Sequence, residues 1–300
     1  MTYSIKELER LSGIKAHTIR IWEKRYKLLQ PERTSGNVRL YPSIELMKLL
    51  NVVTLLENNW KISKISQLNE EQIREEVRHL IESQPVNAEI QINELLRCTI
   101  HYDERGFSEA LSYNFEQMGV RRAFLDVVYP FLNRVGILWQ VADLHPAQEH
   151  FASNLVRRKI ISAIDSLPFE GAEEKETFLL YLPEGEYHEI GLMLANYIIR
   201  SSGFQSCYLG ACVPTHNVCD VVKNVRPDYV VTFYVTSARP EEFLAPLYNV
   251  ADVFEGDAIL VCGNVPKEIV EEDLPKQARV LRKVEDLESL LSDGESISDI

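Results

Sequence analysis

The sequence has no long hydrophobic run. Of its 300 residues 45% are hydrophobic, but no apolar stretch approaches the ~20 residues that a membrane-spanning helix requires. Its first residues are polar and charged, so they do not form the apolar core of a signal peptide. These absences exclude a membrane partner in our interpretation and favour a cytoplasmic protein.

Cysteine is also scarce. Five cysteines are present, with no CxxC pair and no spacing typical of a zinc site. This argues against a disulfide-rich secreted domain and against a zinc finger. We interpret the thiols as reduced residues, mostly in packing roles: Cys98, Cys207, Cys212, Cys219 and Cys262.

Positive charge is scarce overall and concentrated at one end. The net charge is −13, yet residues 1–68 contain 12 Lys or Arg against 6 Asp or Glu. The remaining residues contain 20 Lys or Arg against 39 Asp or Glu. A basic segment joined to an acidic body indicates a polyanionic partner for the first segment alone.

Residues 1–68 show a pattern of short helices around a hairpin. Ser4 and Glu7 can form a capping box for the first helix, and Gly13 ends it. A second helix is predicted over residues 15–26 and another over residues 44–57. Residues 33–41 between them predict a hairpin with its turn at residues 35–37. The prediction is an α winged helix-turn-helix domain over residues 1–68.

Basic and polar side chains gather on the second predicted helix and on the wing. Those of the helix lie mostly on the side away from Ile19, which suits a helix in the major groove. Arginines at the two ends of the wing can reach phosphates or the minor groove. A basic helical domain that binds protein is the alternative. The predicted DNA-binding residues are Lys15, His17, Thr18, Arg20, Lys24, Arg25, Arg33 and Arg39.

Residues 15–26, followed by Arg33 and by Arg39-x-Tyr41, closely resemble MerR-type regulators. The resemblance covers the whole of residues 1–68 and adds Tyr41 to the predicted DNA-binding residues. It implies double-stranded operator DNA as a partner, a homo-oligomer and contact with RNA polymerase. Many MerR-type proteins dimerise through one long helix after this module, whereas several helices are predicted here.

Residues 70–168 are helical by pattern, with apolar residues at three-and-four spacing. A four-helix bundle is the natural arrangement, so this region is the second predicted domain. A short acidic linker follows at residues 171–175. The predicted helices span residues 70–83, 88–102, 107–117, 121–138 and 146–167.

Residues 176–300 alternate strand and helix, which predicts a parallel sheet with helices on both faces. The third predicted domain is therefore doubly wound α/β, Rossmann-like with a flavodoxin-like strand order, and the fold class is mixed multidomain. The polar tail after residue 292 is expected to fray. The predicted strands span residues 178–181, 205–208, 229–234, 258–261 and 278–281.

One histidine follows the first predicted strand of this sheet. Glu186 lies two residues before His188, and Gly191 lies three residues after it. A carboxylate at this spacing can hold an imidazole tautomer, and the glycine lets the backbone approach a ligand. Doubly wound sheets bind ligands at the carboxyl ends of their strands. The loop is therefore a candidate ligand site.

This Glu-x-His-x-x-Gly loop resembles the cobalamin-binding signature, whose histidine is the lower axial ligand of cobalt. Trp139, nine intervening residues and Glu149-His150 resemble the Trp-x9-Glu-His motif of CarH/LitR-type light-sensing repressors. In that family the tryptophan covers the upper face of adenosylcobalamin. The histidine of the Glu-His pair can become the upper cobalt ligand after light breaks the cobalt–carbon bond. The resemblance implies adenosylcobalamin as cofactor and His188 as metal ligand. A core tryptophan and a surface Glu-His pair are the alternative.

The same resemblance assigns loops for the cofactor's nucleotide tail. Residues 209–214 fit the Leu-Gly-x-x-Val-Pro pattern, but Phe233 and Cys262 replace a serine and a glycine. Overfilling such a site costs roughly 1–3 kcal/mol, so either the backbone has shifted or protein partly fills the pocket. The predicted cofactor residues are Trp139, Glu149, His150, Glu186, His188, Gly191, Leu209, Gly210, Val213 and Gly263.

Three functions are compatible with these patterns. The first is a cytoplasmic MerR-type regulator with a CarH-like cobalamin sensor and no catalytic residues. In the second, a degenerate sensor responds to protein contacts or to another ligand. The third is a cobalamin-dependent enzyme or methyl carrier, which we disfavour because no substrate-activating domain fits within the 300 residues. His145 and His216 are interpreted as loop histidines, and the motifs of flavin sites and response-regulator receivers are missing.

Overall fold

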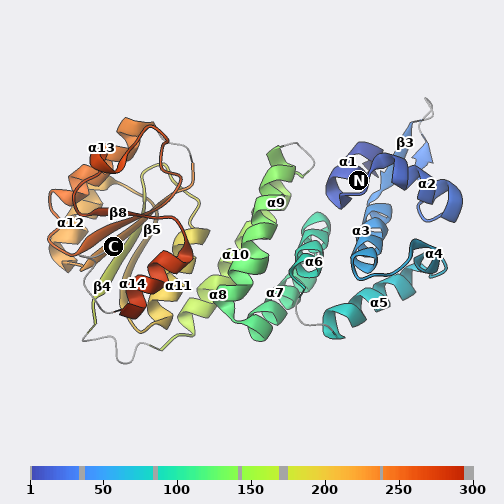
Figure 1. The fold of residues 1–300 in the computed structure, drawn as a ribbon, viewed down its shortest axis with the longest axis horizontal. Coiled ribbons are helices and arrows are strands. Elements are labelled where there is room, and N and C mark those ends of the chain that lie inside the picture. The colour runs from blue at the N-terminus through green and yellow to red at the C-terminus, as the bar shows by residue number, and fades with distance from the viewer. Residues whose placement is uncertain are drawn as a thin grey trace. The chain divides into compact units, whose positions relative to one another are not determined.

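The structure is a computed structural model and divides into two compact units, Met1–Val156 and Arg157–Ile300 (Figure 1). It describes residues 2–33, 38–83, 87–140, 144–168, 175–236 and 239–293. The predicted turn at residues 35–37, most of the linker at 171–175 and most of the polar tail lie outside these ranges. No helix among the described residues combines the length and apolarity that crossing a bilayer requires.

The N-terminal residues form the predicted winged helix-turn-helix. Ser4 and Glu7 make the capping box of α1, and Gly13 ends that helix in the left-handed conformation. The wing is antiparallel with strand order β1-β3-β2, and its short strand β1 carried no sequence pattern. The elements are β1 (Thr2–Tyr3), α1 (Ile5–Ser12), α2 (Ala16–Tyr26), β2 (Glu32–Arg33), β3 (Arg39–Pro42), α3 (Ser43–Glu57) and α4 (Ile62–Ile65).

Helix α5 (Glu70–Ser83) packs against α3, although the prediction had grouped it with the bundle. The following helices form the bundle, and Phe151 of α10 packs edge-on against Phe107 of α7. Its third helix contains a π-helical turn, η1, which buries Phe124. The bundle elements are α6 (Ala88–His101), α7 (Glu104–Met118), α8 (Val120–Ala123), η1 (Phe124–Val128), α9 (Tyr129–Gln140) and α10 (Pro146–Asp165).

The second unit contains a five-stranded parallel sheet with order β5-β4-β6-β7-β8. This is the flavodoxin-like order, so the predicted fold class is confirmed. Helices α12 and α13 contribute to the apolar core on one face, while α11 contacts α14. The elements are β4 (Thr177–Pro183), α11 (Ile190–Ser201), β5 (Gln205–Val213), α12 (Thr215–Val225), β6 (Tyr229–Tyr234), α13 (Pro240–Ala251), β7 (Ala258–Gly263), η2 (Glu271–Asp273), β8 (Ala278–Leu281) and α14 (Val284–Asp293).

Strand β5 is longer than predicted. Leu209, Gly210 and Val213 were expected in a loop, but they lie on the strand itself. The pairing with β4 shifts register near this end, and Gly210 and Cys212 have positive φ angles of 84° and 56°. A β-bulge bends the strand and interrupts its ladder locally, and pairing with β4 resumes beyond the shift, where Pro183 pairs with Val213.

Candidate functional site

Helix α2 presents a basic face opposite its buried face. Ile19 and Trp22 are buried against the head, whereas Thr18 is half-buried. The carboxylate of Glu9 accepts hydrogen bonds from the backbone of Ala16 at 3.0 Å and from Lys15 at 3.1 Å, and these bonds lower its pKa. Glu9 therefore fixes the start of the helix. The predicted residues exposed on this face are Lys15, His17, Arg20, Lys24 and Arg25.

The wing is tied to α2 by Glu23. Arg39 donates from Nε to both Glu23 oxygens at 3.1 and 3.0 Å, and the Tyr41 hydroxyl donates to Oε2 at 3.1 Å. Tyr41 is wholly buried, and burial followed by the nearby Glu23 charge raises its pKa. The predicted DNA contact of Tyr41 is therefore wrong, because its side chain belongs to the core. Arg33 remains exposed on β2.

Arg39 has a different position from the exposed arginines. Its side chain is about one-third exposed, and its Nε is engaged with Glu23. One Nε–H shared between two carboxylate oxygens is a charge-assisted contact that holds the side chain near Glu23. Arg39 thus links the wing to α2 and has fewer free donors for phosphate than Arg20. Sequence spacing did not indicate Glu23, because its partners come from a strand 16 to 18 residues away.

The His188 loop joins β4 to α11 at the carboxyl edge of the sheet. His188 Nδ1 lies 2.6 Å from Oε1 of Glu186, and the imidazole is largely exposed. Glu186 is 3% exposed and accepts further hydrogen bonds from the backbones of Tyr187, His188, Val235 and Thr236. The Thr236 hydroxyl donates as well, at 2.8 Å. The loop is thus anchored on one buried carboxylate.

The ionisation of Glu186 determines the tautomer of His188. Burial raises the pKa of this carboxyl, but the hydrogen bonds from Thr236 and His188 outweigh burial and lower the pKa to about 2. An ionised carboxylate only accepts hydrogen bonds, so Nδ1 must carry the proton that it donates. The outward Nε2 of a neutral ring then keeps its lone pair, which is the form that binds a metal ion.

The positions expected to hold the nucleotide tail are filled by protein. A Cβ at Gly191 would lie 3.1 Å from the Phe233 ring, so the ring occupies the space above this glycine. Phe233 pairs in register with Cys262 on the neighbouring strand, which puts both side chains on one face. Cys262 is buried, and burial raises the pKa of its thiol to about 12. Phe233 and Cys262, which both depart from the family pattern, are therefore neighbours on the same face of the sheet.

Gly263 has a backbone conformation that requires glycine. Its φ is 92°, and a Cβ would collide with the carbonyl oxygen of Tyr234. Only glycine adopts this conformation readily. The backbone at the end of β7 is therefore specified even though Cys262 replaces the preceding glycine of the pattern.

A polar cluster missed by the sequence analysis lies beside the His188 loop. Glu189 is buried and forms an ion pair with Arg157, and the Tyr208 hydroxyl donates to its Oε2 at 3.2 Å. Gly210 lies close by, since a Cβ there would be 3.8 Å from that oxygen. The cluster links α10, the loop and β5 within the second unit. No local pattern indicated it, because the three residues come from separate elements.

The predicted upper-face residues lie in the first unit. Trp139 is 49% exposed at the end of α9, so the alternative of a core tryptophan is wrong. Glu149 Oε2 lies 2.9 Å from Nδ1 of the exposed His150, one residue along α10. The pair is thus a surface pair on a helix, as the alternative expected. The side chains of Trp139 and His150 are therefore both accessible to a ligand.

The site fits a corrinoid in one part and obstructs it in another. The exposed His188 with its buried carboxylate partner has the donor chemistry of an axial cobalt ligand. The Phe233 ring occupies the space above Gly191, where the sequence comparison had placed room for the tail. Among the described residues, no group of three or more His, Cys, Asp or Glu forms a metal cluster.

Comparison with known proteins finds family matches over the head and over the helical bundle. Residues 3–72 match the MerR HTH family regulatory protein, and residues 91–162 match the B12 binding domain. The chain resembles the monomethylamine corrinoid protein of Methanosarcina barkeri with a TM-score of 0.53 and 15% identity, covering 64% of this chain and 92% of that one. This second comparison supports the fold alone.

These findings define a MerR-type DNA-binding transcription regulator with a B12-binding domain. The chain is 31% identical to the HTH-type transcriptional repressor CarH of Myxococcus xanthus over 81% of this chain and 82% of that protein. It is 30% identical to the repressor CarA of the same organism over 89% and 85%. The chain belongs to the family of these MerR-type transcriptional repressors, so the predicted family and the expectation of a regulator instead of an enzyme are confirmed.

Proposed function

We propose that this regulator binds operator DNA through α2 and the wing, and that a corrinoid bound at His188 controls its assembly. The exposed basic face of α2 supports the first part, since helices in this position enter the major groove. The proposed DNA-facing residues are Lys15, His17, Thr18, Arg20, Lys24, Arg25 and Arg33. Arg39 is proposed to position the wing. A homo-oligomer on the operator and contact with RNA polymerase complete the proposal.

The Glu186–His188 pair is the observation that carries the corrinoid part. Glu186 holds Nδ1 of His188, so Nε2 keeps the lone pair with which a neutral imidazole binds a metal ion. A bound corrinoid would supply a cobalt ion, and His188 would offer it a nitrogen ligand. We propose the adenosyl form, and we propose Trp139, Glu149 and His150 of the first unit as further cofactor residues. Phe233 must rotate away from Gly191 for the tail to enter.

The test is the absorbance spectrum of purified protein after incubation with adenosylcobalamin or hydroxocobalamin in the dark. Wild type should retain the pigment through gel filtration and show an imidazole-ligated form. His188→Ala should lose most of the pigment. His216→Ala is the matched control, because His216 is also exposed and opens α12 after β5. Equal retention by His188→Ala would exclude the ligand role.

A second candidate is the same DNA-binding protein with a sensor that no longer binds corrinoid. The contact between the Phe233 ring and Gly191 favours it, because the ring already fills the expected space. Colourless wild-type protein that still shifts operator DNA would support this candidate. Protein contacts or another ligand would then control the regulator.

A further inference from the structure

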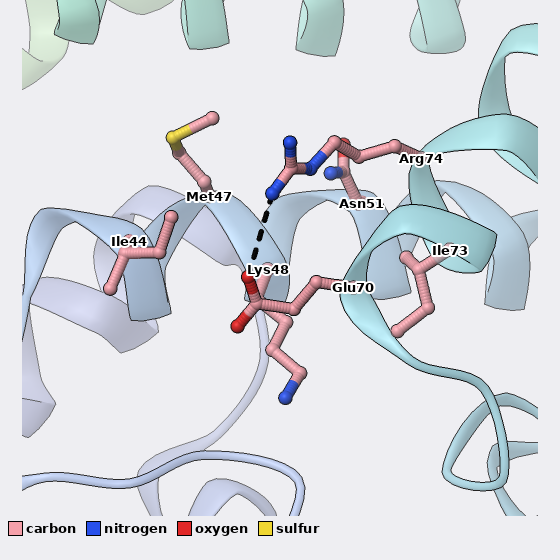
Figure 2. A pocket seen from close by; sticks show the side chains of 7 residues that line it. All are labelled: Ile44, Met47, Lys48, Asn51, Glu70, Ile73 and Arg74. Carbon is pink, nitrogen blue, oxygen red and sulfur yellow. Dashed lines mark hydrogen bonds and ion pairs between the residues drawn. The ribbon is translucent and has the colours of Figure 1, made fainter.

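A cavity of about 220 Å³ lies in the first unit among α3, α5 and α6. Its lining combines apolar side chains with guanidinium groups and one carboxylate. A smaller pocket between α3 and α5 shares three of its lining residues, and Figure 2 shows this pocket from close by. The cavity is lined by Met47, Asn51, Arg74, Val77, Arg78, Glu94 and Arg97.

Asn51 is the feature that a packing role does not explain. It is 8% exposed, and it lines both the cavity and the smaller pocket. Within the described part of the chain, its side-chain amide makes no hydrogen bond. An amide that lines a cavity without a partner can donate a hydrogen bond to a ligand through its nitrogen or accept one through its oxygen.

The charges around the cavity favour an anion. Glu94, its one lining carboxylate, is held by Arg97 through two hydrogen bonds of 2.8 and 2.7 Å. Arg97 also pairs with Asp103 at 3.2 Å. These three groups largely satisfy one another. The remaining charged groups of the lining, Arg74 and Arg78, are both cations.

Among the residues that the structure describes, Arg74 and Arg78 are paired only with exposed carboxylates. Arg74 lies 3.5 Å from Glu70 and 3.5 Å from Glu71, and Figure 2 shows it extending from α5 toward the α3 side chains. Arg78 pairs with Glu75 at 2.6 Å, where both side chains are more than half exposed. Exposed ion pairs contribute little to stability. Either guanidinium can therefore exchange its partner for an oxyanion, which it binds through two parallel hydrogen bonds.

We propose that this cavity binds a small organic anion with a carboxylate or phosphate group. The oxyanion would contact Arg74 and Arg78, Asn51 would bind a polar group, and Met47 and Val77 would cover the apolar part. The volume is below the 300–1,000 Å³ typical of sites for drug-sized ligands, so the ligand is metabolite-sized. Because α3 belongs to the DNA-binding head and α6 to the bundle, an occupant would bridge these two parts. This site is independent of His188 and of corrinoid binding.

Titration calorimetry of the full chain with succinate and with inorganic phosphate tests the proposal. The titrations are run at constant ionic strength, with chloride as the reference anion. Saturable wild-type binding should weaken at least tenfold in Asn51→Leu and in the double variant Arg74→Gln/Arg78→Gln. Arg105→Gln is the matched control, because this exposed arginine pairs with Glu109 on α7 outside the cavity. It should bind within twofold of wild type.

Two further measurements separate the cavity from the DNA-binding face and from loss of folding. Arg20→Gln removes one cation from the head and should leave binding unchanged; loss of binding there alone would place the anion on the DNA face. Circular dichroism checks that each variant is folded. Tighter succinate than phosphate indicates a carboxylate ligand, and the reverse indicates a phosphate ester. Absence of saturable binding by wild type, or equal binding by the cavity variants and the control, would show that the cavity holds only water.

Discussion

Two carboxylates orient the functional groups of the two ends of this protein. Glu23 in the head accepts hydrogen bonds from Arg39 and Tyr41, and Glu186 in the sheet unit accepts them from the His188 ring and from neighbouring backbone and hydroxyl groups. Both act from beneath the surface. They differ in what they leave accessible: Glu23 engages Arg39, whereas Glu186 holds only one nitrogen of His188.

This difference fits the ligands that we propose for the two regions. DNA is a large polyanion, so the head needs several exposed cations on a fixed surface, and α2 supplies them. A corrinoid site needs one directed lone pair and an empty volume beside it. A surface of many cations tolerates the loss of one, whereas an empty volume is lost when a single ring such as Phe233 enters it.

The largest expected effect concerns Glu186. Its folded pKa of about 2 lies below the ordinary 4.5, so its stabilising contribution is fully present above pH 4.5 and is lost as the pH falls toward 2. The shift corresponds to about 3 kcal/mol. We expect Glu186→Gln to lower the free energy of unfolding of the second unit by that order at pH 7, and the difference from wild type to shrink by pH 2.

Urea unfolding monitored at several pH values measures this difference. Because both proteins contain the other carboxylates, the titration of those groups cancels in the difference between the two free energies of unfolding. Glu184→Gln is the control, because Glu184 is exposed two residues earlier in the same loop. A pH-independent difference would show that Glu186 is not held as an anion.

The next effect concerns DNA affinity. Arg20→Ala should weaken operator binding by about 1–3 kcal/mol without unfolding the protein, because Arg20 is exposed on the face of α2. Arg39→Ala should weaken it less, since that side chain contacts Glu23. Electrophoretic shifts at fixed salt compare the two with Arg122→Ala, an exposed arginine of the bundle. Unchanged affinity for Arg20→Ala would overturn the assigned DNA face.

A third effect tests the filled tail positions. Phe233→Ser combined with Cys262→Gly should free the space above Gly191 and raise hydroxocobalamin affinity at least tenfold, or about 1.4 kcal/mol. Calorimetric titration of wild type and the double variant measures the change. Tight wild-type binding with no gain in the variant would show that the ring moves aside at little cost.

The smallest effect separates the head's core from its surface. Tyr41→Phe removes one buried hydrogen bond to Glu23 and should lower the stability of the head by about 1 kcal/mol. Operator affinity of the folded variant should stay within a few-fold of wild type. Thermal unfolding and electrophoretic shifts measure the two quantities. A loss of affinity as large as that of Arg20→Ala would restore Tyr41 to the DNA face.

Local pattern was sufficient for most secondary structure. Strands β6 and β8 and helix α5 have the predicted bounds, because apolar periodicity and breaking residues act over a few neighbours. The π-turn within the third bundle helix and the long β5 were not predicted. Both depend on packing: η1 buries Phe124, and β5 continues because β4 offers it a partner. The division into three domains stays a prediction.

The sequence alone indicated the family, the basic head and the His188 motif, because these depend on residue type at fixed spacing. Only the tertiary structure decided which side chains are free to act. In the structure Tyr41 is buried and Arg39 contacts Glu23. Thr236 donates a hydrogen bond to Glu186, and the Phe233 ring lies over Gly191. Each of these contacts joins residues from separate elements. Their proximity is set by packing and strand register, which local spacing does not encode.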